Sequence, residues 1–147
     1  MMLAELLKTL LGTSFAFYVK SAGFHWNVEG ENFPQYHKFL NKLYVEVYES
    51  LDTTAEFIRT LDEYSPGSMS RFLELSRIQE QTKIPRAELM FKELYQDNQT
   101  IVDLLNECFA AAEQENKQDV ANYIAERLTA HNKHGWMLRA TLRTNRA

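Results

Sequence analysis

Proline and glycine occur at few positions in this chain, and they separate long segments with helical apolar periodicity. Of its 147 residues, three are proline and five are glycine. Gly30 with Pro34, Pro66 with Gly67, and Pro85 fall between segments in which apolar residues recur every three or four positions. Because these residue types end helices far more often than they continue them, the pattern predicts a chain made almost entirely of helices.

Four long helices and one short helix are expected. The second and third open at Pro34 and Pro85, because the first turn of a helix tolerates a missing N–H group. The short helix lies in a long connection between the second and third helices. Together these elements predict an all-α fold, a ferritin-like up-down-down-up four-helix bundle in one domain covering residues 1–147. The expected helices span residues 3–28, 34–62, 69–75, 85–113 and about 118 to near the end.

Composition and charge argue against a disulfide-bonded, membrane-spanning or nucleic-acid-binding protein. Cys108 is the single cysteine, so no intrachain disulfide forms, which fits a reducing compartment such as the cytoplasm. No run of about eighteen apolar residues is present, so no membrane span is expected. Residues 1–11 are apolar, but Glu5 and Lys8 interrupt them and favour an amphipathic helix over a signal peptide. The net charge of -4 argues against a chain that mainly grips phosphate backbones.

The side chains His25, His37, Asp52 and Glu56 form a candidate metal site. On the second helix, Asp52 lies about 60° and Glu56 about 100° around from His37, so the three share one broad face. His37 and Asp52 are nevertheless fifteen positions apart, which separates them by roughly 22 Å along that helix. One chain therefore cannot bring all four side chains to the same metal ion.

Two arrangements satisfy this spacing: separate weak sites, or an antiparallel two-fold pair in which His37 of one subunit faces Asp52 and Glu56 of the other. The second arrangement uses every ligand. It places the symmetry axis near Val45 and gives two identical sites per dimer. Solvated surface is the alternative interpretation of Asp52 and Glu56, because acidic pairs at i, i+4 are common on exposed helix faces.

Two imidazoles and two carboxylates suit Fe(II) or Zn(II) and leave coordination positions open. The usual di-iron bundle brings Glu-x-x-His repeats from within one chain. No histidine here has glutamate three residues before it. The sequence therefore argues against a di-iron centre within one chain and favours a site between subunits.

At these residues the chain resembles the Dps family, the mini-ferritins named as DNA-binding proteins from starved cells. The similarity extends over nearly the whole chain and includes Tyr64 to Ser68 and Trp136 to Ala140. The key segment keeps every interval of the family pattern: Phe24, His25, Trp26, Asn27, Val28, Gly30, Phe33, His37, Phe39, Tyr44, Asp52, Ala55 and Glu56.

The resemblance implies a ferroxidase and iron-storage protein. His25 and His37 of one subunit and Asp52 and Glu56 of its mate would bind Fe(II), which hydrogen peroxide or dioxygen oxidises. Ferric oxide is then stored inside a hollow dodecamer, which protects against oxidative damage. Trp26 and Tyr44 beside the site are expected to pack at the interface or to intercept stray radicals.

Three features depart from the family pattern or leave alternatives open. Many members carry a lysine-rich tail, and here only Arg139, Arg143 and Arg146 cluster near one end, so DNA binding is not expected. His131 and His134 suggest a further metal site, but a hydrogen-bonded core histidine is favoured for His131. In family members, aspartates at the start of the fourth helix line a three-fold pore through which iron enters, and one of these positions is Asn122 here. Asp119, Glu113 and Glu126 are the candidate substitutes. The alternative interpretation is that acidic residues at a helix start only favour the helix dipole.

Two other functions remain open from the sequence. One is a non-catalytic shell that holds zinc or coats DNA, and the other is a helical oligomer without metal.

Overall fold

The structure, a computed structural model, describes residues 2–143. Met1 and residues 144–147, including Arg146 of the C-terminal basic cluster, lie outside the described part. The described chain consists of helices and their connections, and the expected helical bundle is confirmed. The helices are α1 (Leu3–Asn27), α2 (Phe33–Thr60), α3 (Met69–Leu75), α4 (Ala87–Gln114) and α5 (Gln118–Leu142).

The helix ends differ from the expected ones by one or two residues, for local reasons. α2 ends at Thr60 rather than near residue 62, because Asp62 has a φ of 62°, in the left-handed region that helices do not continue through. α4 begins at Ala87 rather than Pro85, because Arg86 is extended, with φ -65° and ψ 159°. Neither difference moves a candidate ligand out of its helix.

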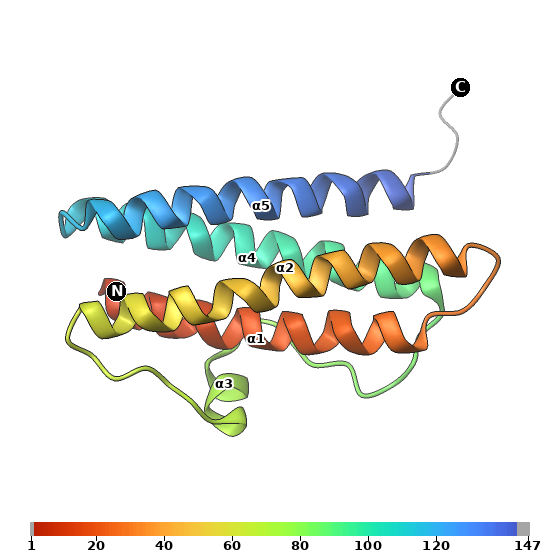
Figure 1. The fold of residues 1–147 in the computed structure, drawn as a ribbon, viewed down its shortest axis with the longest axis horizontal. Helices are drawn as coiled ribbons and strands as arrows, with labels where there is room; N and C mark the ends of the chain where they lie inside the picture. The colour runs from red at the N-terminus through yellow and green to blue at the C-terminus, as the bar shows by residue number, and fades with distance from the viewer. Residues whose placement is uncertain (1, 144–147) are drawn as a thin grey trace.

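The long connection between α2 and α4 sets the topology. α1 and α2 run antiparallel, the chain then returns along the whole bundle, and α4 runs parallel to α2 (Figure 1). α5 runs back along α4, which completes the up-down-down-up arrangement that the sequence predicts. α1 packs along both α2 and α4.

The core lies between the four long helices and is made of side chains at helical spacing. Leu7 and Phe17 of α1, Leu43 of α2, Leu105 of α4 and Ile124 of α5 have essentially no exposed surface. Burying such side chains stabilises the fold by about 1.5–3 kcal/mol each. The apolar stripes of the four long helices therefore form the core that holds the bundle together.

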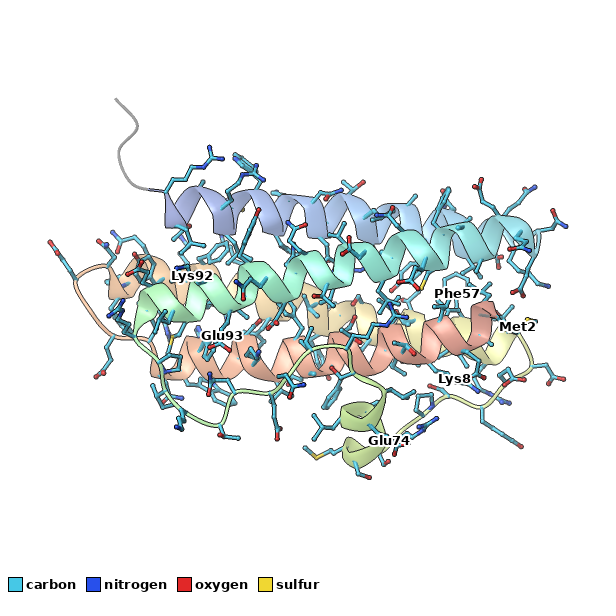
Figure 2. All side chains as sticks on the ribbon, turned by 180° about the vertical axis from the view of Figure 1, so that it is seen from behind. Met2, Lys8, Phe57, Glu74, Lys92 and Glu93 are labelled. Carbon is cyan, nitrogen blue, oxygen red and sulfur yellow. The ribbon has the colours of Figure 1, made fainter. Side chains whose placement is uncertain are left out.

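The short helix α3 docks against α1 at Gly12. A Cβ atom on Gly12 would lie 2.7 Å from the carbonyl oxygen of Phe72 and 2.9 Å from the Cβ of Leu75. The connection is also held near Lys8, which is labelled beside it in Figure 2 and whose Nζ donates to Glu63 at 2.9 Å. Glycine in α1 is thus what lets α3 approach so closely.

None of the helices in residues 2–143 combines the length and the apolarity that crossing a membrane requires.

Candidate metal centre

A tight turn between α1 and α2 builds the first half of the candidate site. Val28 is buried and ends α1, and Gly30 takes a φ of +122°, which glycine adopts at little cost. The Phe33 N–H donates to the Gly30 carbonyl at 3.1 Å, and Pro34 occupies the first turn of α2. The turn brings His25, in the last turn of α1, against His37 near the start of α2.

The imidazoles of His25 and His37 hold each other in place. Their rings stack with centroids 3.8 Å apart and planes 14° apart. His25 Nδ1 donates to the His37 carbonyl and His37 Nδ1 donates to the His25 carbonyl, both at 2.7 Å. Because a carbonyl only accepts, both Nδ1 atoms carry protons, and in the neutral imidazole Nε2 is then the atom with the lone pair. This is the state in which imidazole binds a metal ion.

Aromatic rings surround this imidazole pair. Phe33 stacks on His37 with centroids 5.0 Å apart, and Tyr44 lies against His25 at 5.4 Å. Trp26, next in sequence to His25, has 70% of its surface exposed. The pair is thus partly shielded by the subunit itself, while a large apolar side chain beside it faces outward.

The structure does not bring the predicted carboxylates to this pair within one chain. Asp52 and Glu56 are exposed on α2, beyond its midpoint. Among residues 2–143, no three histidine, cysteine, aspartate or glutamate side chains gather closely enough to hold a metal ion. Within one subunit the two imidazoles and the two carboxylates therefore lie apart.

A second polar cluster, which sequence reasoning did not assemble, joins α2, α4 and α5 in the middle of the bundle. Glu46 of α2 accepts from both Nη atoms of Arg127 and, at 2.7 Å, from Nε2 of His134. His131 Nδ1 donates to Asn98 Oδ1 at 2.8 Å, and Asn98 Nδ2 donates to the His131 carbonyl at 2.8 Å. The sequence analysis singled out only His131 and His134, and the position of Arg127 four residues before His131 on α5 is the further signal that could have indicated this cluster.

Charge and burial set the protonation states of His131 and Glu46 in the second cluster. Burial and the neighbouring Arg127 guanidinium hold the pKa of His131 well below its usual range. Burial alone would raise the pKa of Glu46, but the hydrogen bonds from His134 and Arg127 outweigh it and hold that pKa well below its usual range. The cluster is a half-buried ion pair between Glu46 and Arg127 with the neutral His131 behind it. The prediction that His131 is a hydrogen-bonded core histidine is confirmed.

The predicted pore residues lie near the junction of α4 and α5. Glu113 and Asn122 line one shallow hollow at this junction. Asp119 is in the first turn of α5, where its carboxylate accepts from the Val120 N–H at 2.9 Å, and Glu126 is exposed further along that helix. Their role in iron entry stays a prediction.

Comparisons with known proteins identify the family of the chain. A family model described as the ferritin-like domain matches residues 4–147. A DNA protection during starvation protein of Helicobacter pylori is 30% identical over 139 residues, which cover 94% of this chain and 96% of the relative.

Solved structures give the same result. The crystal structure of Dps from Staphylococcus aureus has a TM-score of 0.94 at 28% identity, covering 97% of this chain and 96% of that one. Dps from Vibrio cholerae, described as a member of a broad superfamily of ferritin-like diiron-carboxylate proteins, has a TM-score of 0.92 at 25% identity, covering 96% and 89%. The chain therefore belongs to the Dps branch of the ferritin-like domain family.

Proposed function

We propose that this chain is the subunit of an iron-storage protein that oxidises Fe(II) at sites shared by two subunits. Hydrogen peroxide, or dioxygen in its place, is the oxidant. The observation that carries the proposal is the imidazole pair, because Nδ1 of His25 and of His37 donates to a backbone carbonyl, which leaves Nε2 of each ring to bind a metal ion. Iron is the substrate and the stored cargo of this reaction.

The complete site takes His25 and His37 from one subunit and Asp52 and Glu56 from a second copy. This set has two neutral nitrogen donors and two anionic oxygen donors, and it leaves positions for water and oxidant. Zn(II) fits the same donors and would act as a competitor without redox chemistry. The exposure of Asp52 and Glu56 supports the proposal, since a carboxylate given to a partner must not be buried in its own subunit.

A two-fold dimer with its axis near Val45 provides two such sites. Large apolar side chains remain exposed in the free subunit around the imidazole pair. Trp26 and Val19 line a hollow with Met69 of α3, and Trp26 and Phe33 line its neighbour. Exposed apolar surface of this kind marks contact with another protein surface.

The dimers assemble further into a hollow dodecamer that stores ferric oxide and protects a cytoplasm from oxidative damage. The family membership supports this step. Iron enters near the α4–α5 junction, where Glu113, Asp119 and Glu126 supply negative charge.

The reaction is tested by stopped-flow measurement of ferric absorbance after mixing Fe(II) and hydrogen peroxide with the protein. His25→Ala and Asp52→Asn should each abolish the fast phase. Asp103→Asn is the matched control, because Asp103 is an exposed carboxylate on α4. Unchanged kinetics in both site variants would refute the ligand assignment.

Sharing between subunits is tested by mixing. One variant carries His25→Ala with His37→Ala, and the other carries Asp52→Asn with Glu56→Gln. Each is inactive alone, but a mixed dimer contains one intact site. Random pairing at equal amounts should recover about a quarter of the wild-type sites, because half of the dimers are mixed and each has one intact site of two. A site made within one chain would recover nothing.

DNA coating is the second candidate, and the name of the Helicobacter pylori relative favours it. The net charge of -4 opposes it, because binding to phosphate backbones needs clustered basic charge. A gel-shift assay at moderate salt with iron-free protein separates the two functions. Retarded DNA would support coating, and free DNA with intact iron oxidation would leave the ferroxidase function alone.

A further inference from the structure

The guanidinium group of Arg127 lies between a carboxylate and an imidazole in the middle of the bundle. Its Nη2 atom donates to Oε1 of Glu46 at 3.1 Å and to Nε2 of His131 at 2.9 Å. His134 Nε2 donates to the same Glu46 oxygen at 2.7 Å, and its ring lies 5.2 Å from the ring of His131. One carboxylate and two imidazoles are thus gathered around a cation that belongs to the chain itself.

The same three side chains form a donor set that binds metal ions in other proteins. Two histidines with one glutamate hold Zn(II) in some catalytic sites, and two histidines with one carboxylate hold Fe(II). His131 is also oriented as metal-binding histidines usually are. Its Nδ1 donates to Oδ1 of Asn98 at 2.8 Å, so the lone pair of Nε2 is directed at the cation. This donor set is separate from the one proposed between subunits.

Ions can reach this position from solvent. The side chain of Glu46 is 38% exposed, whereas those of Arg127 and His134 are 9% and 11% exposed. A metal ion would therefore meet the carboxylate first and the imidazoles behind it. If the position were free, it would compete for Fe(II) with the proposed sites between subunits.

Arginine is well suited to keep a metal ion out of this position. The guanidinium does not lose its proton in proteins, and none of its nitrogen atoms has a lone pair to give to a metal ion. In the part of the chain that the structure describes, no three potential ligand side chains stand close enough to hold a metal ion, and here the guanidinium separates Glu46 from His131. A metal ion would have to displace a cation that is covalently tethered to α5.

We propose that Arg127 occupies a latent metal site formed by Glu46, His131 and His134, and that it excludes Fe(II) from the interior of the bundle. The latent site does not depend on the proposed ferroxidase function. Its consequence for iron does rest on that function, since exclusion confines oxidation to the sites between subunits. Arg127 therefore determines where metal binds without binding metal itself.

Replacing Arg127 should exchange one cation for another. In Arg127→Ala the guanidinium is gone, and the lone pair of His131 Nε2 has no donor facing it. A divalent ion can then bind Glu46 and both Nε2 atoms, once the Nε2 proton of His134 has moved through solvent to Nδ1. The three side chains have to close in around the ion, because they are now spaced for a guanidinium.

Cobalt(II) absorption spectroscopy tests the latent site in a protein that lacks the shared site. The background carries His25→Ala with His37→Ala, so the result does not depend on the proposed function. Adding Arg127→Ala should create about one Co(II) site per subunit, seen as the visible absorption of a four- or five-coordinate ion. The background alone should show no such absorption. Arg77→Ala is the matched control, because it removes an arginine from an ion pair with Glu107 that contains no histidine.

A further change tests the ligands. Glu46→Gln added to the Arg127→Ala protein should remove the cobalt absorption. Arg127→Met, which keeps the aliphatic part of the side chain, repeats the measurement if Arg127→Ala unfolds. Folding that requires cobalt in either variant would support the latent site, because the metal ion then replaces the guanidinium. A folded variant that binds no cobalt would overturn the latent site, and equal cobalt absorption in the background would overturn the exclusion by Arg127.

The consequence for iron is measured with the shared site intact. Anaerobic titration should show that Arg127→Ala binds about one more Fe(II) per subunit than wild type. Equal binding would overturn the exclusion of iron and leave the ferroxidase function standing. Loss of the fast ferric phase in wild type would overturn the ferroxidase function and leave the latent site standing.

Discussion

Arg127 Nη2 donates a hydrogen bond to His131 Nε2 across 2.9 Å in the interior of the bundle. Arginine has no acceptor, so His131 Nε2 must carry a lone pair, and Nδ1 carries the proton that goes to Asn98. A second proton, on Nε2, would make His131 a donor facing the Arg127 N–H donor, and the hydrogen bond between them would be lost. The neutral state of this histidine is therefore built into the packing of α5.

Acid should destabilise the protein through His131. The pKa of His131 in the folded protein lies well below the ordinary value of 6.5. Below pH 6.5 the unfolded chain therefore binds a proton at this residue that the folded chain does not bind. The free energy of unfolding should fall as pH drops below about 6.5, by up to about 1.4 kcal/mol per pH unit for one proton. Urea denaturation at a series of pH values measures the slope, and His131→Gln should remove this part of it. Equal slopes near pH 6 in both proteins would contradict the prediction.

Glu46→Gln should destabilise the bundle by about 1–2 kcal/mol. The change leaves Arg127 and His134 without their anion, but the Glu46 side chain is 38% exposed, so solvent screening reduces the cost below that of a fully buried pair. The folded pKa of Glu46 is lowered from 4.5, so its contribution is present above that pH and is lost as pH falls below it. Denaturation at pH 7 and pH 3 should show the difference between wild type and variant shrinking in acid.

Two glycines of α1 should respond in opposite ways to alanine. At Gly12 a Cβ would collide with the backbone of α3, so Gly12→Ala should destabilise by about 1–3 kcal/mol and loosen α3. At Gly23 nothing lies within 4 Å of the added Cβ, so Gly23→Ala should stabilise by about 0.5–1 kcal/mol. Thermal unfolding of the pair measures both effects. If both variants change the melting temperature by a similar amount in the same direction, helix propensity alone explains the effect of alanine at both positions.

Cys108 should be inert in the folded protein. Burial raises the pKa of its thiol to about 12, so almost no thiolate exists near neutral pH. A thiol-specific reagent should leave the native protein unmodified and label one cysteine after denaturation. Fast labelling under native conditions would mean that α4 opens locally around this residue.

Zn(II) should raise the melting temperature of wild type through the proposed shared site. A metal ion that binds only the folded state stabilises it in proportion to the logarithm of its concentration. His37→Ala and Glu56→Gln should each lose most of the shift, whereas Asp103→Asn should keep it. Equal shifts in all variants would assign the zinc to other surface groups.

The helices were predictable because their signals are local. Apolar spacing and the placement of Pro34 and Gly30 depend only on neighbours in sequence, and the chain follows them closely. The contact between His25 and His37 was implied by the short turn that joins their helices. Their reciprocal bonds to backbone carbonyls could not be predicted, because these bonds depend on the rotation of one helix against the other.

The ion pair between Glu46 and Arg127 illustrates the same limit over a longer range. Eighty-one positions separate the two residues, and their meeting depends on the register between α2 and α5. A charged residue at Glu46 looks like ordinary helix surface in the sequence. Only the position of Arg127 on the buried side of α5, four residues before His131, indicates that an anion must come from elsewhere.

The reciprocal bonds of His25 and His37 also determine how the candidate iron site meets its ion. Both Nδ1 atoms are committed to carbonyl oxygens, so a metal ion can bind these rings only through their Nε2 atoms. Taking up or releasing an ion at Nε2 breaks none of the bonds between the two ends of the turn that joins α1 to α2. This half of the site therefore has its shape before iron arrives and keeps it after iron leaves.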